Sequence, residues 1–235
     1  QRQMCIRDRF INTNYHRCDD VKVYNHQTFI HADGEKLPFK DKEFDYVICN
    51  QVLEHVDDPQ LFIAELCRVS KRGYIETPSL IGEYLFPKES HKWVILDIDG
   101  KLVMYEKARM PGNYKNDYGD LFLYHLPFQS LPYKLLWLTE RNMMINHYEW
   151  EDNVEVIVNP EDEYYQSFFT KKWDKSMSTK LYPPRSAFTE IKETVKAVIY
   201  MTKNKIRDKF RHHKSPISLA EYSKTHEILH YQCEE

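Results

Sequence analysis

The stretch that decides the fold of this chain is FIHADGEKLPFKDKEFDYVICNQVLEHVDDPQLFIAELCRVSKRGYIETP, residues 29–78. It holds three short apolar runs, at residues 29–32, 44–49 and 74–75, and each run ends in polar residues. Runs this short, rich in Val, Ile, Tyr and Phe, are typical of buried parallel strands. The stretch therefore predicts three strands of one parallel sheet.

A helix is predicted between the second and third runs. Asp58 suits its N-cap and Pro59 its first position, and an apolar stripe follows at helical spacing: Leu61, Phe62, Leu66 and Val69. Strands joined by such a helix form half of a doubly wound α/β sheet, and these sheets bind ligands beyond the carboxyl ends of their strands. Asp33, Asn50 and Glu76 lie at such ends, which makes them candidate ligand-binding residues.

Composition narrows the class of protein. At 235 residues the chain can bury one substantial core. Its 33 Lys+Arg against 36 Asp+Glu leave a net charge of -3, so no overall basic field favours nucleic acid. No apolar run approaches the roughly 20 residues that span a bilayer. The five cysteines are scattered without a CxxC pair, which favours reduced thiols and a cytoplasmic location.

The pattern D-x-E-x-LPF-x-D-x-x-FDYV-x-x-x-x-VLEHV-x-D-P, within residues 33–59, resembles the middle of a class I S-adenosylmethionine-dependent methyltransferase. The resemblance is to the methyltransferase type 11 domain, a broad type that includes quinone-biosynthesis methyltransferases. It implies a Rossmann-like, mostly parallel sheet whose final strands are antiparallel, and S-adenosylmethionine as cofactor. The RGYIETP ending at residues 72–78 is more similar to methyltransferases of surface-polysaccharide gene sets, so the acceptor of the quinone enzymes is not carried over.

The resemblance also implies roles for four residues. Asp33 would accept a hydrogen bond from the adenine amine, and Gly34 would allow close approach of the cofactor. Asn50 and Gln51 would meet the methionine end of the cofactor. The residues themselves leave alternatives open, because Asp33 could be a loop carboxylate that caps a turn, and Asn50 and Gln51 could cap the strand-to-helix connection.

His55 is the candidate catalytic residue. An imidazole beside the carboxylate of Glu54 could act as general base for a substrate hydroxyl or amine. Methyl transfer from a sulfonium depends mainly on proximity and needs little base chemistry. The alternative is that the Glu54–His55 pair forms a structural turn.

The glycine-rich loop of class I methyltransferases is missing from the sequence. The six glycines, none of them in a GxG pattern, are Gly34, Gly73, Gly82, Gly100, Gly112 and Gly119. Residues 1–9 include MCIRD, which resembles a translated sequencing adapter, so we expect them to be a non-native leader outside the fold. We therefore expect a methyltransferase domain over residues 10–159 that lacks its N-terminal βα unit.

The remaining chain predicts further elements. Residues 93–105, with Asp99-Gly100 at their centre, read as a hairpin, and residues 117–126 and 132–142 read as helices. Residues 148–158 predict a second antiparallel hairpin that closes the sheet. Residues 160–235 form an extension, whose aromatic first part, up to residue 184, either covers the pocket or packs on the sheet edge.

The extension carries two further motifs. Apolar residues keep helical spacing from Phe188 to Phe210, which predicts a helix. The basic stretch at residues 203–214 could dock on an anionic membrane or a lipid-linked glycan. The alternative is that it forms a solvated helix face. The sequence of residues 226–230, HEILH, matches the zinc-hydrolase signature H-E-x-x-H. The other interpretation is a chance match in a polar tail. We expect no resident metal.

Together these features predict a cytoplasmic enzyme that transfers a methyl group from S-adenosylmethionine to a small-molecule or lipid- or glycan-linked acceptor, with no nucleic acid partner. The alternative hypothesis is a non-catalytic remnant or binding module that has the fold but lacks the cofactor loop. A zinc hydrolase built on HEILH is a remote third hypothesis.

Overall fold

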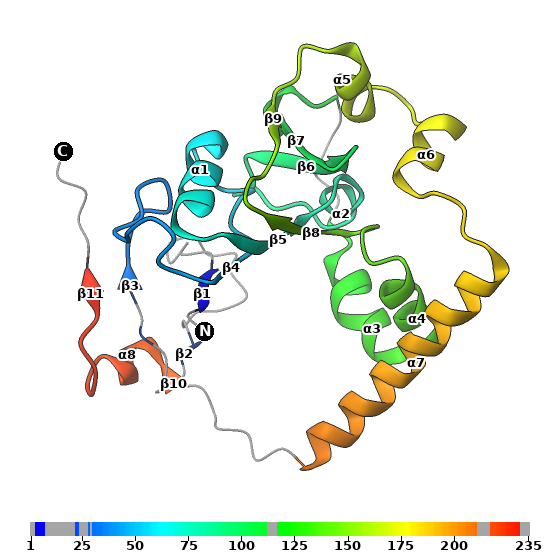
Figure 1. The fold of residues 1–235 in the computed structure, drawn as a ribbon. Helices are drawn as coiled ribbons and strands as arrows, with labels where there is room; N and C mark the ends of the chain where they lie inside the picture. Colours follow the sequence, from blue (N-terminus) through cyan, green and yellow to red (C-terminus); the bar gives the residue numbers. More distant parts are fainter. Residues whose placement is uncertain are drawn as a thin grey trace.

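The structure, a computed structural model, describes residues 3–7, 22–23, 28, 30–111, 117–210 and 217–230. Its larger sheet has the order β1-β4-β5-β8 (Figure 1). These strands are β1 (Gln3–Arg7), β4 (Tyr46–Asn50), β5 (Arg72–Pro78) and β8 (Ile145–Glu151). The first three are parallel and β8 is antiparallel. The chain is therefore a mixed α/β protein with an antiparallel strand at the edge of a parallel group, as predicted.

Helix α1 (Pro59–Val69) connects β4 to β5 and packs on them as the sequence predicts, except that Leu61 of the predicted stripe is exposed. Its N-cap is Asp58, whose side chain accepts hydrogen bonds from the amides of Gln60 and Leu61. Phe62 and Leu66 on its apolar face are fully buried, in one core cluster with Val47 of β4. A capped, amphipathic helix over a parallel strand pair is the expected βαβ arrangement.

A second sheet contains β6 (Trp93–Ile98), β7 (Lys101–Glu106) and β9 (Val156–Val158). The predicted hairpin is confirmed, because β6 and β7 pair antiparallel around Asp99-Gly100. Both turn residues have positive φ, 57° and 73°, as a two-residue hairpin turn requires. Phe168 and Phe169 of α5 (Glu163–Thr170) are buried against this sheet, so this part of the aromatic segment packs on a sheet.

The remaining elements are mostly short. They are β2 (Lys22–Val23), α2 (Leu80–Leu85), the 3-10 helix Lys107–Arg109, the π-helix Asp120–His125, α3 (Leu126–Gln129), α4 (Leu131–Thr139), α6 (Lys175–Leu181), α7 (Ala187–Phe210), β10 (Ile217–Ser218) and α8 (Leu219–Tyr222). The helical predictions for residues 117–142 and 188–210 are thus confirmed in outline. Helix α7 runs beside α4 (Figure 1). No helix in the described residues is long and apolar enough to cross a membrane.

Two expectations about strands are wrong. Residues 1–9 were expected to lie outside the fold, but Gln3–Arg7 form β1 and pair with β4, Gln3 opposite Tyr46 and Arg7 opposite Asn50. The run at residues 29–32 was expected to join the same parallel sheet. Among the described residues of this run, Ile30–His31 form β3, which pairs with β11 (Leu229–His230) in a separate two-stranded sheet.

The expected hairpin at residues 148–158 is also wrong. β8 pairs with β5, whereas β9 pairs parallel with β7 of the second sheet. Asp152 lies between them with a positive φ of 63°, and its amide donates to the carbonyl of Lys71. This turn directs the chain from one sheet to the other, so the two strands cannot pair with each other.

Candidate active site at the strand ends

The carboxyl ends of β4 and β5 bring three polar residues together. Asn50 and Glu76 are register partners on these parallel strands. Gln51 follows with a positive φ of 56°, and its amide donates to the carbonyl of Glu76 at 2.8 Å. Its side-chain Nε2 lies 3.5 Å from Glu76 Oε1. The predicted pair Asn50 and Gln51 therefore shares one strand edge with Glu76.

Glu76 is part of a hydrogen-bonded group that the sequence did not reveal. Tyr74 donates its hydroxyl to Glu76 Oε2 at 2.6 Å, and His147 Nδ1 lies 3.5 Å from the same oxygen. His147 comes from β8, where it is the register partner of Glu76. Burial raises the pKa of Tyr74, and the bond to Glu76 adds to this. Tyr74 could have been inferred, since residues two apart on a strand share a face, but His147 could not.

His147 should make the stability of the chain depend on pH. Burial, and then the charge of Arg141, lower its pKa in the folded state, so the unfolded chain binds this proton more readily. The stabilisation is fully present above the unfolded pKa of about 6.5 and is lost as the pH falls through the lower folded pKa. We expect urea unfolding to show a smaller loss of stability below pH ~6.5 for His147→Gln than for the wild type. The exposed His125→Gln is the matched control and should keep the wild-type pH dependence. If His147→Gln keeps it as well, His147 is not the cause of the pH-dependent stability.

The other predicted pair, Asp33 and Gly34, lies on a loop against the N-terminus of α1. Asp33 Oδ1 accepts from the amide of Glu35 at 2.9 Å, so Asp33 caps a turn. A Cβ on Gly34 would lie 2.6 Å from the ring of Phe62, so close packing requires glycine here. Glu35 in turn accepts from the amides of Asp57 and Asp58, at 2.8 and 3.0 Å. These contacts match the turn-capping alternative, and an adenine contact stays a prediction.

The described residues fit only part of the implied cofactor. The amides and carboxylate of Asn50, Gln51 and Glu76 suit an amino-acid group such as the methionine end. β1 occupies the strand position next to β4, but the first glycine of the chain is Gly34. No glycine therefore lies between β1 and Gly34, where it would let the backbone approach the cofactor closely. The residues present do not form the glycine-rich half of such a site.

His55 lies in a buried turn directly after β4. Its side chain is 5% exposed, and its amide donates to the carbonyl of Val52 at 2.9 Å. The ring Nδ1 lies 2.9 Å from the carbonyl oxygen of Ser90, and the carbonyl of Glu54 accepts from the amides of Lys92 and Trp93. These contacts match the structural-turn alternative. A role for His55 as general base stays a prediction.

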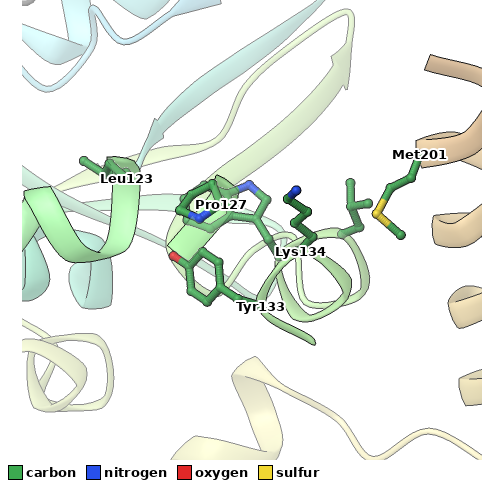
Figure 2. A pocket seen from close by; sticks show the side chains of 7 residues that line it. Leu123, Pro127, Tyr133, Lys134 and Met201 are labelled. Carbon is green, nitrogen blue, oxygen red and sulfur yellow. The ribbon is translucent and has the colours of Figure 1, made fainter. Parts of the chain in front are cut away.

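Two hollows lie elsewhere on the described chain. An apolar groove of about 340 Å³ is lined by Leu123, Pro127, Tyr133, Lys134, Trp137, Leu138 and Met201 (Figure 2). A polar one of about 330 Å³ is lined by Leu96, Asp97, Asp99, Gly100, Asn142, Asn146, Lys180, Leu181 and Tyr182. Neither lining includes Asn50, Gln51 or Glu76, so the hollows do not mark the strand-end site.

The HEILH motif does not have the geometry of a zinc hydrolase. Such a site needs both histidines on one face of a helix, one turn apart. Leu229–His230 instead form β11, and His226 follows a turn, where its ring stacks on Tyr222. The zinc-hydrolase hypothesis is therefore wrong for this motif.

Comparison with known proteins supports the resemblance. Residues 4–75 match the family model of the methyltransferase domain. The chain is 36% identical over 73 residues to an uncharacterized methyltransferase of Schizosaccharomyces pombe, 30% of this chain and 26% of that protein. It is 38% identical over 65 residues to demethylmenaquinone methyltransferase of Anoxybacillus flavithermus, 25% of this chain and 27% of that protein. An uncharacterized protein of Methanocaldococcus jannaschii is 55% identical over 42 residues, 18% of this chain and 20% of that protein.

The matched region contains β4 and α1 and most of β1 and β5. This part of the chain is therefore similar to a methyltransferase domain. The match also begins within the leader that was expected to be non-native. The matched stretches cover between 20% and 27% of the three relatives, so they span at most about a quarter of each.

Proposed function

We propose that this chain contributes to methyl transfer from S-adenosylmethionine to oxygen, nitrogen or carbon of a small-molecule or lipid- or glycan-linked acceptor. The observation that carries the proposal is the β4–α1–β5 unit, which lies largely within the methyltransferase match. Its strand ends bring together Asn50, Gln51 and, just beyond the match, Glu76. Ligands of doubly wound α/β sheets bind at this edge. The doubly wound arrangement itself is part of the proposal.

The proposed roles follow the strand ends. Asn50, Gln51 and Glu76 would hold the ammonium and carboxylate of the methionine end, and the loop with Asp33 and Gly34 would lie toward the adenine. The cofactor supplies an electrophilic methyl group on its sulfonium. The protein's part is to hold acceptor and methyl group in line, which accounts for much of the catalysis in such reactions.

We extend the proposal to location and partners. Cys49 is buried and Cys67 is partly buried, and neither forms a disulfide, which suits a cytoplasmic protein. Lys203, Lys205 and Arg207 are exposed near the end of α7 and could contact an anionic membrane or lipid-linked acceptor. Arg211 and Lys214 of the same basic stretch lie outside the described residues.

A second candidate function is a binding module without catalysis. It is favoured by one observation, that β1 takes the place beside β4 with no glycine before Gly34. Without a glycine-rich loop the cofactor would lose several backbone hydrogen bonds, each worth about 0.5–1.5 kcal/mol.

Calorimetric titration with S-adenosylhomocysteine separates the two functions. We compare the 235-residue chain with a version whose reading frame is continued upstream. If the upstream sequence supplies a strand and glycine-rich loop, the extended chain should bind at least about tenfold more tightly. Asn50→Ala in that chain should weaken binding by about tenfold, while exposed Asn142→Ala should not change it. Equal, undetectable binding by both chains would contradict methyl transfer and leave the binding-module function.

A further inference from the structure

Two loops bring a glutamate and two histidines together inside the protein. Glu54 and His55 come from the loop after β4, and His91 comes from the segment between α2 and β6. One ligand-type atom of each residue lies within 4.8 Å of those of the other two. Glu54 is 1% and His55 5% exposed, and the side chain of His91 is 9% exposed. The cluster is thus a buried set of one carboxylate and two imidazoles, drawn from two segments far apart in the sequence.

Both imidazoles are oriented by an outer hydrogen bond. His55 Nδ1 lies 2.9 Å from the carbonyl oxygen of Ser90, and His91 Nδ1 lies 2.6 Å from Glu83 Oε2. Because carbonyl and carboxylate oxygens accept, Nδ1 carries the proton in both rings, and Nε2 is the nitrogen with the lone pair that a metal ion requires. Histidine ligands of metals nearly always show this outer bond to a carbonyl or carboxylate.

The outer partner of His91 is itself fixed. Glu83 is 2% exposed and forms an ion pair with Lys107. Lys107 Nζ also donates to the carbonyl of Lys88 at 2.6 Å. This pairing keeps Glu83 in place as an acceptor, so the orientation of the His91 ring does not depend on a mobile surface group.

The backbone of the two loops is joined as well. The amides of Lys92 and Trp93 donate to the carbonyl of Glu54 at 2.8 and 3.2 Å. Trp93 Nε1 donates to the carbonyl of Val56 at 2.8 Å. The rings of His55 and His91 lie edge to face with centroids 4.7 Å apart. The three ligand groups are therefore held before any ion arrives, which reduces the entropic cost of binding.

We propose that Glu54, His55 and His91 form a binding site for a divalent transition-metal ion, with the Glu54 carboxylate and Nε2 of both histidines as ligands. Two imidazoles and one carboxylate suit Zn²⁺, Co²⁺, Fe²⁺ or Mn²⁺ better than Mg²⁺ or Ca²⁺, which prefer all-oxygen sites. Three protein ligands leave coordination positions open to water or a further ligand. The sequence alone predicted no resident metal, because nothing in it links His91 to Glu54.

The test uses the untagged, metal-stripped full chain titrated with Co²⁺, whose visible absorption reports its ligands. We expect one equivalent to bind and the thermal unfolding temperature to rise with Co²⁺ concentration, as for any ion that binds only the folded state. His91→Gln retains an N–H donor for Glu83 but removes the imidazole ligand. Glu54→Gln removes the anionic carboxylate ligand. Each should weaken Co²⁺ binding by about 10–100-fold or more, since even outer-shell changes have effects of this size.

Control variants locate the bound ion. His125→Gln on the surface, and the double variant His226→Gln/His230→Gln in the HEILH motif, should bind Co²⁺ as the wild type does. Loss of binding in the double variant with retention in His91→Gln would place the ion in the tail and overturn the proposal. Absence of stoichiometric binding, with no rise in the unfolding temperature of the wild type, would overturn it too. Even if a ligand variant folds poorly, the wild-type temperature measurement and the double variant can still overturn the proposal.

Discussion

Replacing Asn146 by aspartate is expected to lower the free energy of unfolding by about 3–5 kcal/mol at neutral pH. Asn146 is 3% exposed, and its Nδ2 donates to Thr77 Oγ1 at 3.1 Å, to the carbonyl of Pro78 at 3.1 Å and to that of Ile95 at 2.9 Å. It thereby joins β8 to β5 and to β6 of the second sheet. An aspartate of the same shape has no donor, so a buried negative charge would face carbonyl oxygens.

Urea unfolding of Asn146→Asp beside Asn142→Asp measures this effect. Asn142 is exposed, and the same change there should alter stability by no more than about 0.5 kcal/mol. Since small domains are stable by only about 5–15 kcal/mol, Asn146→Asp should leave the chain close to unfolding. A loss below about 1 kcal/mol for Asn146→Asp would show that the two sheets do not depend on this side chain.

The second large effect is expected at Gly73 in β5. A Cβ there would lie 2.5 Å from the carbonyl oxygen of Val47, 2.6 Å from Val47 Cγ1 and 2.9 Å from Trp150 Cε2. Val47 and Trp150 are the register partners of Gly73 on the two neighbouring strands, so neither can withdraw without parting the sheet. We expect Gly73→Ala to cost about 3 kcal/mol, at the upper end for overpacked cores.

Gly100→Ala is the matched control for Gly73→Ala. Nothing lies within 4 Å of a Cβ at Gly100, but its φ of 73° disfavours alanine, so about 1 kcal/mol of backbone strain is expected. Denaturant unfolding should therefore rank Gly73→Ala as clearly the more destabilised. The reverse order would show that β4 and β5 can separate to admit a methyl group, and that the strand-end site is not rigidly spaced.

The sequence predicted the helix starts and turns that depend on a few neighbouring residues. Asp58 and Pro59 predicted the start of α1, and Asp99-Gly100 predicted the β6–β7 turn, because capping and positive φ are properties of a few neighbouring residues. The order of β4, α1 and β5 followed from apolar runs of the right length. These elements are also the ones that carry Asn50 and Gln51.

Pairings between distant segments could not be predicted in this way. β1 lies in a segment that resembles a translated adapter, so its sequence did not predict a strand, and β3 pairs with β11 near the other end of the described chain. β8 and β9 were wrongly joined because the turn at Asp152 gives no sign of which sheet each strand enters. For the same reason His147 beside Glu76, and His91 beside His55, emerge only from the structure.

The most direct test of the strand-end site is amide chemical-shift mapping of the chain on addition of S-adenosylhomocysteine. At about 1 mM ligand even weak binding populates the complex, so the missing glycine-rich loop does not hide the site. We predict the largest shift changes at the amides of Asn50, Gln51 and Glu76. Changes confined to the apolar groove around Tyr133, or no changes at this concentration, would contradict a cofactor site at the carboxyl ends of β4 and β5.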